Sequence, residues 1–164
     1  MLLKSDVVLF DYRGFGASPG RPTEQGVKDD AVAVYEHLMS LNYRSCIILG
    51  ESIGGVPALH LYRLGLGSGA ILLSTFAKIG DAVPSSLRWL TRGFDNMTID
   101  KKDTRPILLL HSRSDTIIPY ESALTLYHRL QEFLPAQLIE INGDHNEPTL
   151  TAQATQIVAR TFRK

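Results

Sequence analysis

Apolar stretches of strand length, separated by helical patterns, constrain the fold of this chain more than any other feature. Near-continuous apolar runs occupy residues 6–12, 46–49, 69–74 and 106–111, and a fifth run at 137–142 alternates. Continuous runs suit strands of a parallel sheet buried on both faces, and alternation places the fifth run nearer a sheet edge. Apolar residues recur at helical spacing in residues 27–38, 56–64, 123–133 and 150–162. This alternation predicts an α/β fold with mostly parallel pairing.

The bulk properties favour one domain over residues 1–164 and exclude several classes of function. Basic and acidic residues balance at 17 each, which argues against a nucleic-acid-binding protein. No apolar run is long enough to span a bilayer, and the first residues lack the features of a signal peptide, so a cytoplasmic location is expected. The single cysteine, Cys46, lies in an apolar run and is interpreted as a buried hydrophobic residue.

Residues 76–105 interrupt the alternation of predicted strands and helices. This segment is longer than a plain connection and contains a short amphipathic piece at 87–94. It is interpreted as a lid-like insertion or as the crossover helix that parallel strands need anyway. Trp89, Phe94 and Met97 are candidates to line a substrate pocket, or else they pack the lid.

A glycine-rich motif joins one predicted strand to the helix that follows it. Residues 50–55 read Gly-Glu-Ser-Ile-Gly-Gly and come directly after the run at 46–49. Gly-x-Ser-x-Gly between a strand and a helix is typical of a nucleophile elbow, a strained turn that exposes the serine hydroxyl. The motif therefore makes Ser52 a candidate nucleophile. The alternative is an ordinary glycine-rich turn that packs closely.

Two further residues complete a candidate catalytic triad. Asp115 follows the strand predicted at 106–111, and His145 follows the strand predicted at 137–142. The carboxyl ends of parallel strands share one edge of the sheet, so the two side chains are expected to converge with Ser52 there. Taken singly, Asp115 could cap a loop and His145 could be an exposed loop histidine.

Other acids and histidines compete less well for these roles. Asp144 is adjacent to His145 and is expected to point away from it, and Asp103 precedes its strand at the wrong end. Glu51 cannot easily reach the imidazole. His111 is interpreted as a structural residue near the site rather than as the base.

The chemistry that follows is acyl transfer to water. Ser52 attacks the carbonyl of an ester, thioester or amide, His145 takes its proton, and Asp115 orients and stabilises the imidazole. The backbone N–H of Ile53 donates to the oxyanion. This reaction requires neither a metal nor another cofactor.

Four segments of the chain resemble the α/β-hydrolase superfamily. They are residues 10–20 (Phe-Asp-Tyr-Arg-Gly-Phe-Gly-Ala-Ser-Pro-Gly), residues 50–55, Ser-Asp at 114–115 with Ile-Pro at 118–119, and Gly-Asp-His-Asn at 143–146. The resemblance is strongest to the branch of α/β-hydrolase-domain proteins that includes protein depalmitoylases and lysophospholipid and monoacylglycerol lipases. Peptidases of the serine aminopeptidase type are more distant. The resemblance implies that Ser52, Asp115 and His145 form the triad and that Ile53 supplies one oxyanion donor.

The resemblance also implies an N-terminally truncated hydrolase fold that lacks the family's first three strands. In the family, the strand at 6–12 is the fourth, and the third lies between it and the strand at 46–49 and precedes the second oxyanion donor. Both strands are therefore expected to expose apolar edges, which makes self-association plausible. We expect the chain alone to be poorly folded or less active than an extended version, which parallel labelling by a fluorophosphonate probe would test.

The leading hypothesis is a serine hydrolase that cleaves a carboxylic ester or thioester of a small-molecule, lipid-like or acylated substrate. An amidase or peptidase with the same triad is the second hypothesis. A catalytically weak or silent fragment with an interaction role is the third, and acyl transfer to an acceptor other than water stays open.

Overall fold

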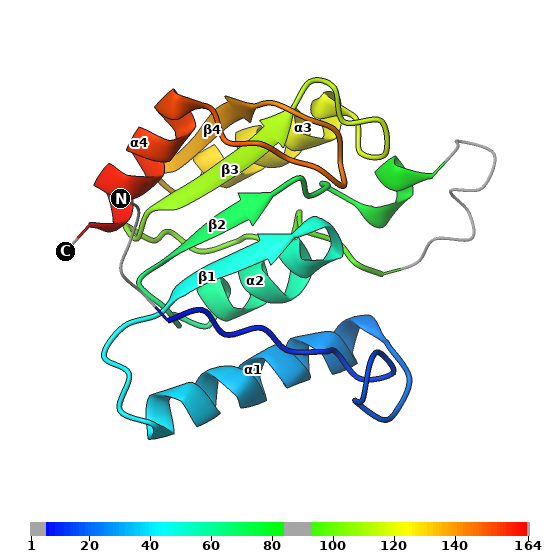
Figure 1. Ribbon diagram of the computed structural model, residues 1–164, viewed down its shortest axis with the longest axis vertical. Coiled ribbons are helices and arrows are strands. Elements are labelled where there is room, and N and C mark those ends of the chain that lie inside the picture. The colour runs from blue at the N-terminus through cyan, green and yellow to red at the C-terminus, as the bar shows by residue number, and fades with distance from the viewer. Residues whose placement is uncertain (1–5, 84–92, 164) are drawn as a thin grey trace.

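The computed structural model describes residues 6–83 and 93–163, which form a parallel sheet with helices on both faces (Figure 1). The strands are β1 (Ile47–Glu51), β2 (Gly69–Leu73), β3 (Ile107–Ser112) and β4 (Ala136–Ile141). The helices are α1 (Glu24–Ser40), α2 (Gly55–Arg63), α3 (Tyr120–Gln131) and α4 (Ala152–Phe162), with short 3₁₀ turns η1 (Ser52–Gly54) and η2 (Ile79–Ala82). The α/β fold with mostly parallel pairing expected from the sequence is thus confirmed for the described part of the chain.

The strands lie in the sheet in the order in which they occur in the chain. β1 pairs with β2, β2 with β3, and β3 with β4, and every pair is parallel. All four strands therefore point the same way, as the arrows in Figure 1 show, and their carboxyl ends share one edge. β4 lies at one side of the sheet, where its alternating pattern places it.

The two faces of the sheet bury separate hydrophobic clusters, because neighbouring side chains of a strand point to opposite faces. Ala70 and Leu72 of β2 join the larger cluster, which contains residues of α1, α2 and α3. Ile71 of β2 joins the second cluster with β3, β4 and α4. Helices α2 and α3 thus cover one face and α4 covers the other, while α1 packs on α2 (Figure 1).

Threonine caps begin the first and last helices. The Thr23 side chain accepts a hydrogen bond from the Gly26 N–H, which confirms the N-cap predicted for α1. Thr151 accepts from the Ala154 N–H at the start of α4 in the same way. Each bond satisfies one of the N–H groups that a helix leaves free in its first turn.

The strand predicted at 6–12 does not form, and this prediction is wrong. The segment has no regular secondary structure, and the side chains of Val7 and Leu9 are 81% and 87% exposed. A strand is held by hydrogen bonds to a neighbour, and the described residues supply none here because β1 pairs on one side alone. Leu49 of β1 is accordingly 60% exposed. The expected exposure of apolar side chains in both segments is confirmed.

This open edge leads to a prediction about association. We expect the chain to form concentration-dependent oligomers through β1, and Leu49→Lys to shift it towards monomer, because a lysine on an edge strand opposes pairing. Light scattering coupled to size-exclusion chromatography measures the mass. Leu64→Lys, at an exposed leucine just after α2, is the matched control. A monomeric parent, or equal effects of both lysines, would rule out association through β1.

The segment expected to form a lid lies partly outside the described residues. Its amphipathic piece at 87–94 is described only from residue 93 onwards. Within residues 76–105, Lys78 and Asp95 form an isolated antiparallel β-bridge. Among the helices of the described ranges, none combines the length and apolar character needed to cross a membrane.

Candidate active site

Ser52 lies in a strained turn between β1 and α2. Its φ angle is 51°, in the left-handed region that non-glycine residues rarely adopt. Gly50 makes the turn possible, because a Cβ there would lie 2.3 Å from the Gly54 carbonyl oxygen and 2.6 Å from the Ala58 side chain. The turn leaves Ser52 half-buried at the carboxyl end of β1.

The structure brings Ser52, His145 and Asp115 together in a continuous hydrogen-bonded row. Nε2 of His145 lies 3.0 Å from Oγ of Ser52, and its Nδ1 lies 2.8 Å from Oδ2 of Asp115. The carboxylate accepts only, so Nδ1 carries the proton and Nε2 is free to accept the serine hydroxyl. Asp115 and His145 are each 8% exposed, which shields the bond between them from competing water.

The loop after β3 holds the Asp115 carboxylate in a fixed orientation. Its Oδ1 accepts from the backbone N–H groups of Ile117 (3.0 Å) and Ile118 (2.8 Å), which leaves Oδ2 for the imidazole. His111 stands behind this loop, with Nε2 2.9 Å from the Ile118 carbonyl oxygen and 3.5 Å from Oδ2 of Asp115. The structure thus places His111 beside the acid and not between acid and nucleophile.

Burial lowers the pKa of His111, and this leads to a prediction about stability. The folded chain keeps His111 neutral at a pH where the unfolded chain already protonates it, so stability falls as pH drops below about 6.5. His111→Gln retains a donor for Ile118 but does not titrate. We expect the parent to lose up to about 1.4 kcal/mol of its free energy of unfolding for each pH unit below that value, and the variant not to show this loss. Urea unfolding between pH 7.5 and 5 measures this, and parallel curves for parent and variant would contradict it.

Asp144 ties together the loops that carry the acid and the base. Its carboxylate accepts from the N–H (2.8 Å) and hydroxyl of Thr116 and from the N–H of His145 (2.7 Å). These bonds, first of all the Thr116 N–H, hold the pKa of the Asp144 carboxyl below its ordinary value. The carboxylate that lies 2.8 Å from the imidazole is that of Asp115. Asp103 instead pairs with Arg105 at 2.6 Å, before β3 begins.

Ile53, the candidate oxyanion donor, directly follows Ser52 and lies in the η1 turn that leads into α2. The first N–H groups of a helix have no partner within it, which leaves them available to an oxyanion. Sequence reasoning missed one contact to this turn. Oγ1 of Thr75, just beyond β2, lies 2.6 Å from the Ser52 carbonyl oxygen. Its position after the end of a strand was the available signal.

The candidate pocket-lining residues fall into different surroundings. Trp89 lies outside the described residues. Phe94 packs against a small cluster of Val56, Phe76 and Ile118, next to the Asp115 loop. Met97 packs against the larger core cluster instead. Of the two, Phe94 is the one that packs against the cluster containing Ile118 of the Asp115 loop.

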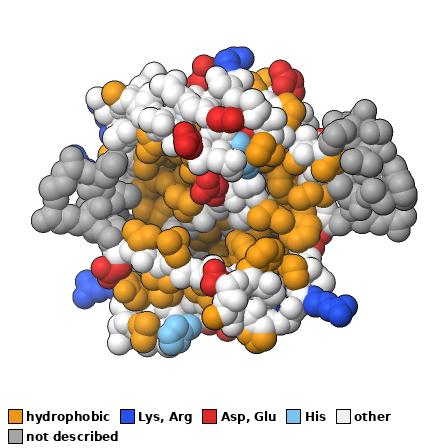
Figure 2. Space-filling view, turned by 45° about the vertical axis from the view of Figure 1, so that its right-hand side comes forward, with side chains coloured by type: hydrophobic (Ala, Val, Ile, Leu, Met, Phe, Trp, Pro, Cys, Tyr) orange, Lys and Arg blue, Asp and Glu red, His pale blue; other side chains and the backbone are white. Residues whose placement is uncertain are grey.

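Apolar side chains remain exposed around the candidate site. Ile53 and Ile117, the latter two residues after Asp115, are both exposed, as is Phe15 of the loop before α1. Figure 2 shows hydrophobic side chains gathered around a hollow on one face of the molecule. An apolar substrate portion would find contacts on such a surface.

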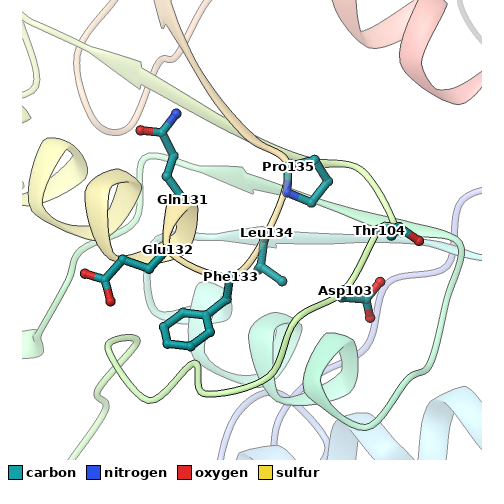
Figure 3. Close-up of a pocket in the computed structure, with 7 residues that line it drawn as sticks. All are labelled: Asp103, Thr104, Gln131, Glu132, Phe133, Leu134 and Pro135. Atoms are coloured by element: carbon teal, nitrogen blue, oxygen red, sulfur yellow. The ribbon is translucent and has the colours of Figure 1, made fainter.

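A separate pocket of about 370 Å³ lies at the opposite edge of the sheet (Figure 3). It is lined by residues that precede β3 and β4, among them Asp103, Phe133 and Pro135. The side chains in Figure 3 spread outward and do not converge on a common point. The candidate site therefore stays at the carboxyl edge, where parallel sheets usually bind ligands.

A parallel sheet with a serine elbow after one strand, an acid after another and a histidine after the last defines an α/β hydrolase. The chain belongs to the α/β-hydrolase family whose sequence model, Hydrolase_4 (serine aminopeptidase, S33), matches residues 4–105. The resemblance to the branch of α/β-hydrolase-domain proteins, drawn from the sequence motifs, is confirmed.

Similar proteins agree with this assignment. The uncharacterized protein YfhR of Escherichia coli K12 is 34% identical over 152 residues, which cover 85% of this chain and 53% of YfhR. Human alpha/beta hydrolase domain-containing protein 17B is 29% identical over 157 residues, which cover 92% of this chain and 54% of the human protein. The Pyrococcus furiosus esterase Pf2001 superposes with a TM-score of 0.66 at 18% identity, covering 82% of this chain and 60% of the esterase. The chain spans about half the length of the curated relatives it matches.

Proposed function

We propose that this chain carries the catalytic centre of a serine hydrolase that cleaves carboxylic esters or thioesters of an acyl or lipid-like substrate. The row from Ser52 through His145 to Asp115, with contacts of 3.0 Å and 2.8 Å, carries the proposal. Exposed apolar side chains at Ile53 and Ile117 support an apolar acyl group.

The reaction has two halves. Oγ of Ser52 attacks the acyl carbon while Nε2 of His145 takes the hydroxyl proton, and the N–H of Ile53 donates to the oxyanion. Collapse of the tetrahedral intermediate releases the alcohol or thiol, which receives the proton from His145. Water then attacks the acyl carbon while His145 takes a proton from it, the bond from that carbon to Oγ of Ser52 breaks, His145 returns the proton to Oγ, and the acid product leaves. Asp115 keeps Nδ1 protonated throughout.

The test combines covalent labelling with substrate turnover. A fluorophosphonate probe is expected to add to Ser52, which mass spectrometry of the peptide that contains it detects. p-Nitrophenyl esters of increasing chain length then measure turnover. A folded chain that neither labels at Ser52 nor hydrolyses any ester would exclude the hydrolase. The same assays on a version extended upstream test whether further residues raise the rate.

An amidase or peptidase is the second candidate, because the matching family model is described as a serine aminopeptidase. Aminoacyl-p-nitroanilides assayed beside the esters distinguish the two reactions. Faster turnover of the anilides, measured as kcat/KM, would favour the peptidase. A catalytically silent interaction role is the third candidate, favoured by the edge of β1 that stays unpaired among the described residues. Any hydrolysis that depends on Ser52 excludes it.

A further inference from the structure

Two buried polar residues outside the triad converge on the peptide group that follows the nucleophile. Thr75 lies just beyond the end of β2 and is 3% exposed, and Asn96 is 1% exposed. Oγ1 of Thr75 lies 2.6 Å from the Ser52 carbonyl oxygen, and Nδ2 of Asn96 lies 3.3 Å from Oγ1 of Thr75. A second bond, of 2.8 Å, joins Nδ2 of Asn96 to the Phe76 carbonyl oxygen.

The direction of each hydrogen bond in this group follows from the partners. The Phe76 carbonyl only accepts, so the Asn96 atom beside it is the amide nitrogen. That nitrogen donates to Thr75, which leaves the Thr75 hydroxyl proton for the Ser52 carbonyl, itself an acceptor only. The chain of donors therefore runs from Asn96 through Thr75 to the carbonyl of Ser52.

The carbonyl of Ser52 and the N–H of Ile53 belong to one peptide group. A peptide group is planar, so fixing its carbonyl also fixes the direction of its N–H. A hydrogen bond accepted by the carbonyl polarises the group and strengthens the N–H as a donor. We propose that Thr75 and Asn96 are positioning residues that aim and strengthen the Ile53 N–H as the oxyanion donor. This inference rests on the proposed hydrolase function.

The surrounding backbone is arranged to allow this contact. Ser74 has a φ of 45° and is buried, which turns the chain sharply at the end of β2 and places Thr75 beside the elbow. A Cβ on Gly55 would lie 2.2 Å from Oγ1 of Thr75, so glycine at that position lets the hydroxyl approach. This close approach explains why glycine occupies the second position of the Gly54-Gly55 pair.

The test removes the hydroxyl and then restores it. Thr75→Val keeps the shape of the side chain, and Thr75→Ser keeps the hydroxyl. We expect Val to lower kcat for an ester about tenfold, less than the hundred- to thousand-fold cost of deleting a donor outright, with KM unchanged. The affinity of a boronic acid that mimics the tetrahedral intermediate should fall in parallel. Serine should restore both values.

Controls separate this role from a merely structural one. Thr125→Val removes a hydroxyl that also donates to a backbone carbonyl, that of Glu121, on an exposed face of α3. It should change neither kcat nor boronate affinity. A Thr75→Val variant with kcat within about twofold of the parent, or a Thr75→Ser variant as slow as Val, would overturn the inference. If valine prevents folding, Thr75→Ala removes the same hydroxyl and is compared with serine.

One measurement needs no turnover and so separates failure of this inference from failure of the proposed function. A hydrogen bond to the Ser52 carbonyl displaces the ¹⁵N resonance of the Ile53 amide downfield. We expect this resonance to move upfield in Thr75→Val and to stay in place in Thr75→Ser and Thr125→Val. An unchanged Ile53 resonance in Thr75→Val would refute the positioning role even in an inactive chain.

Discussion

Ser52→Ala is expected to lower kcat for ester hydrolysis by roughly 10⁶-fold. Alanine removes the atom that bonds to the acyl carbon, so no acyl-enzyme can form. Stopped assays with p-nitrophenyl esters measure the loss, and the fluorophosphonate adduct should disappear with it. Thermal unfolding checks that the variant stays folded.

The effect should also be non-additive with loss of the base. Ser52 and His145 act as one unit across their 3.0 Å contact, so His145→Ala alone and the double variant should fall to about the same residual rate. His128→Ala, at an exposed histidine of α3, is the matched control and should retain full activity. Losses that multiply in the double variant would show that the two residues act independently and would contradict the triad.

Asp115→Asn is expected to lower kcat about 10⁴-fold without moving any backbone atom. The N–H groups of Ile117 and Ile118 will retain an oxygen at the Oδ1 position, which forces the new NH₂ group to face His145. The imidazole must then accept at Nδ1 and carry its proton on Nε2, towards Ser52. In that tautomer His145 cannot take the serine proton.

The tautomer itself can be measured. ¹⁵N NMR of the His145 ring should show the proton on Nδ1 in the parent and on Nε2 in Asp115→Asn. Asp103→Asn makes the same chemical change before β3, where Asp103 pairs with Arg105, and should leave both tautomer and kcat unchanged. An Asp115→Asn variant with the parent's kcat would remove Asp115 from the proposed mechanism.

Much of the fold could be predicted because local pattern and tertiary environment agree. The runs at 69–74 and 106–111 are apolar at nearly every position because β2 and β3 pack against residues on both faces. The side chains of Ser52, Asp115 and His145 could be expected to meet because parallel strands bring their carboxyl ends to one edge. Their catalytic roles remain a proposal.

The failures have a different physical origin. Residues 6–12 have the composition of a strand, but a strand depends on a neighbour, and composition does not reveal whether one is present. Thr75 offered only its position just after a strand, and Asn96 offered no signal, because a threonine and an asparagine in a loop are ordinary until their partners are known. The role of Asp144 was hidden for the same reason, since Thr116 is 28 residues away in the sequence.

The order of strands in the sheet also determines when the proposed triad can assemble during synthesis of the chain. Ser52 and His145 are 93 residues apart, and they meet only after β4 has joined β3 at the far side of the sheet. At a translation rate of roughly 5–20 residues per second, the serine leaves the ribosome about 5–20 seconds before its base. A nascent chain therefore carries an unactivated hydroxyl. On the proposed mechanism, the hydrolase becomes competent only when β4 has brought His145 to Ser52.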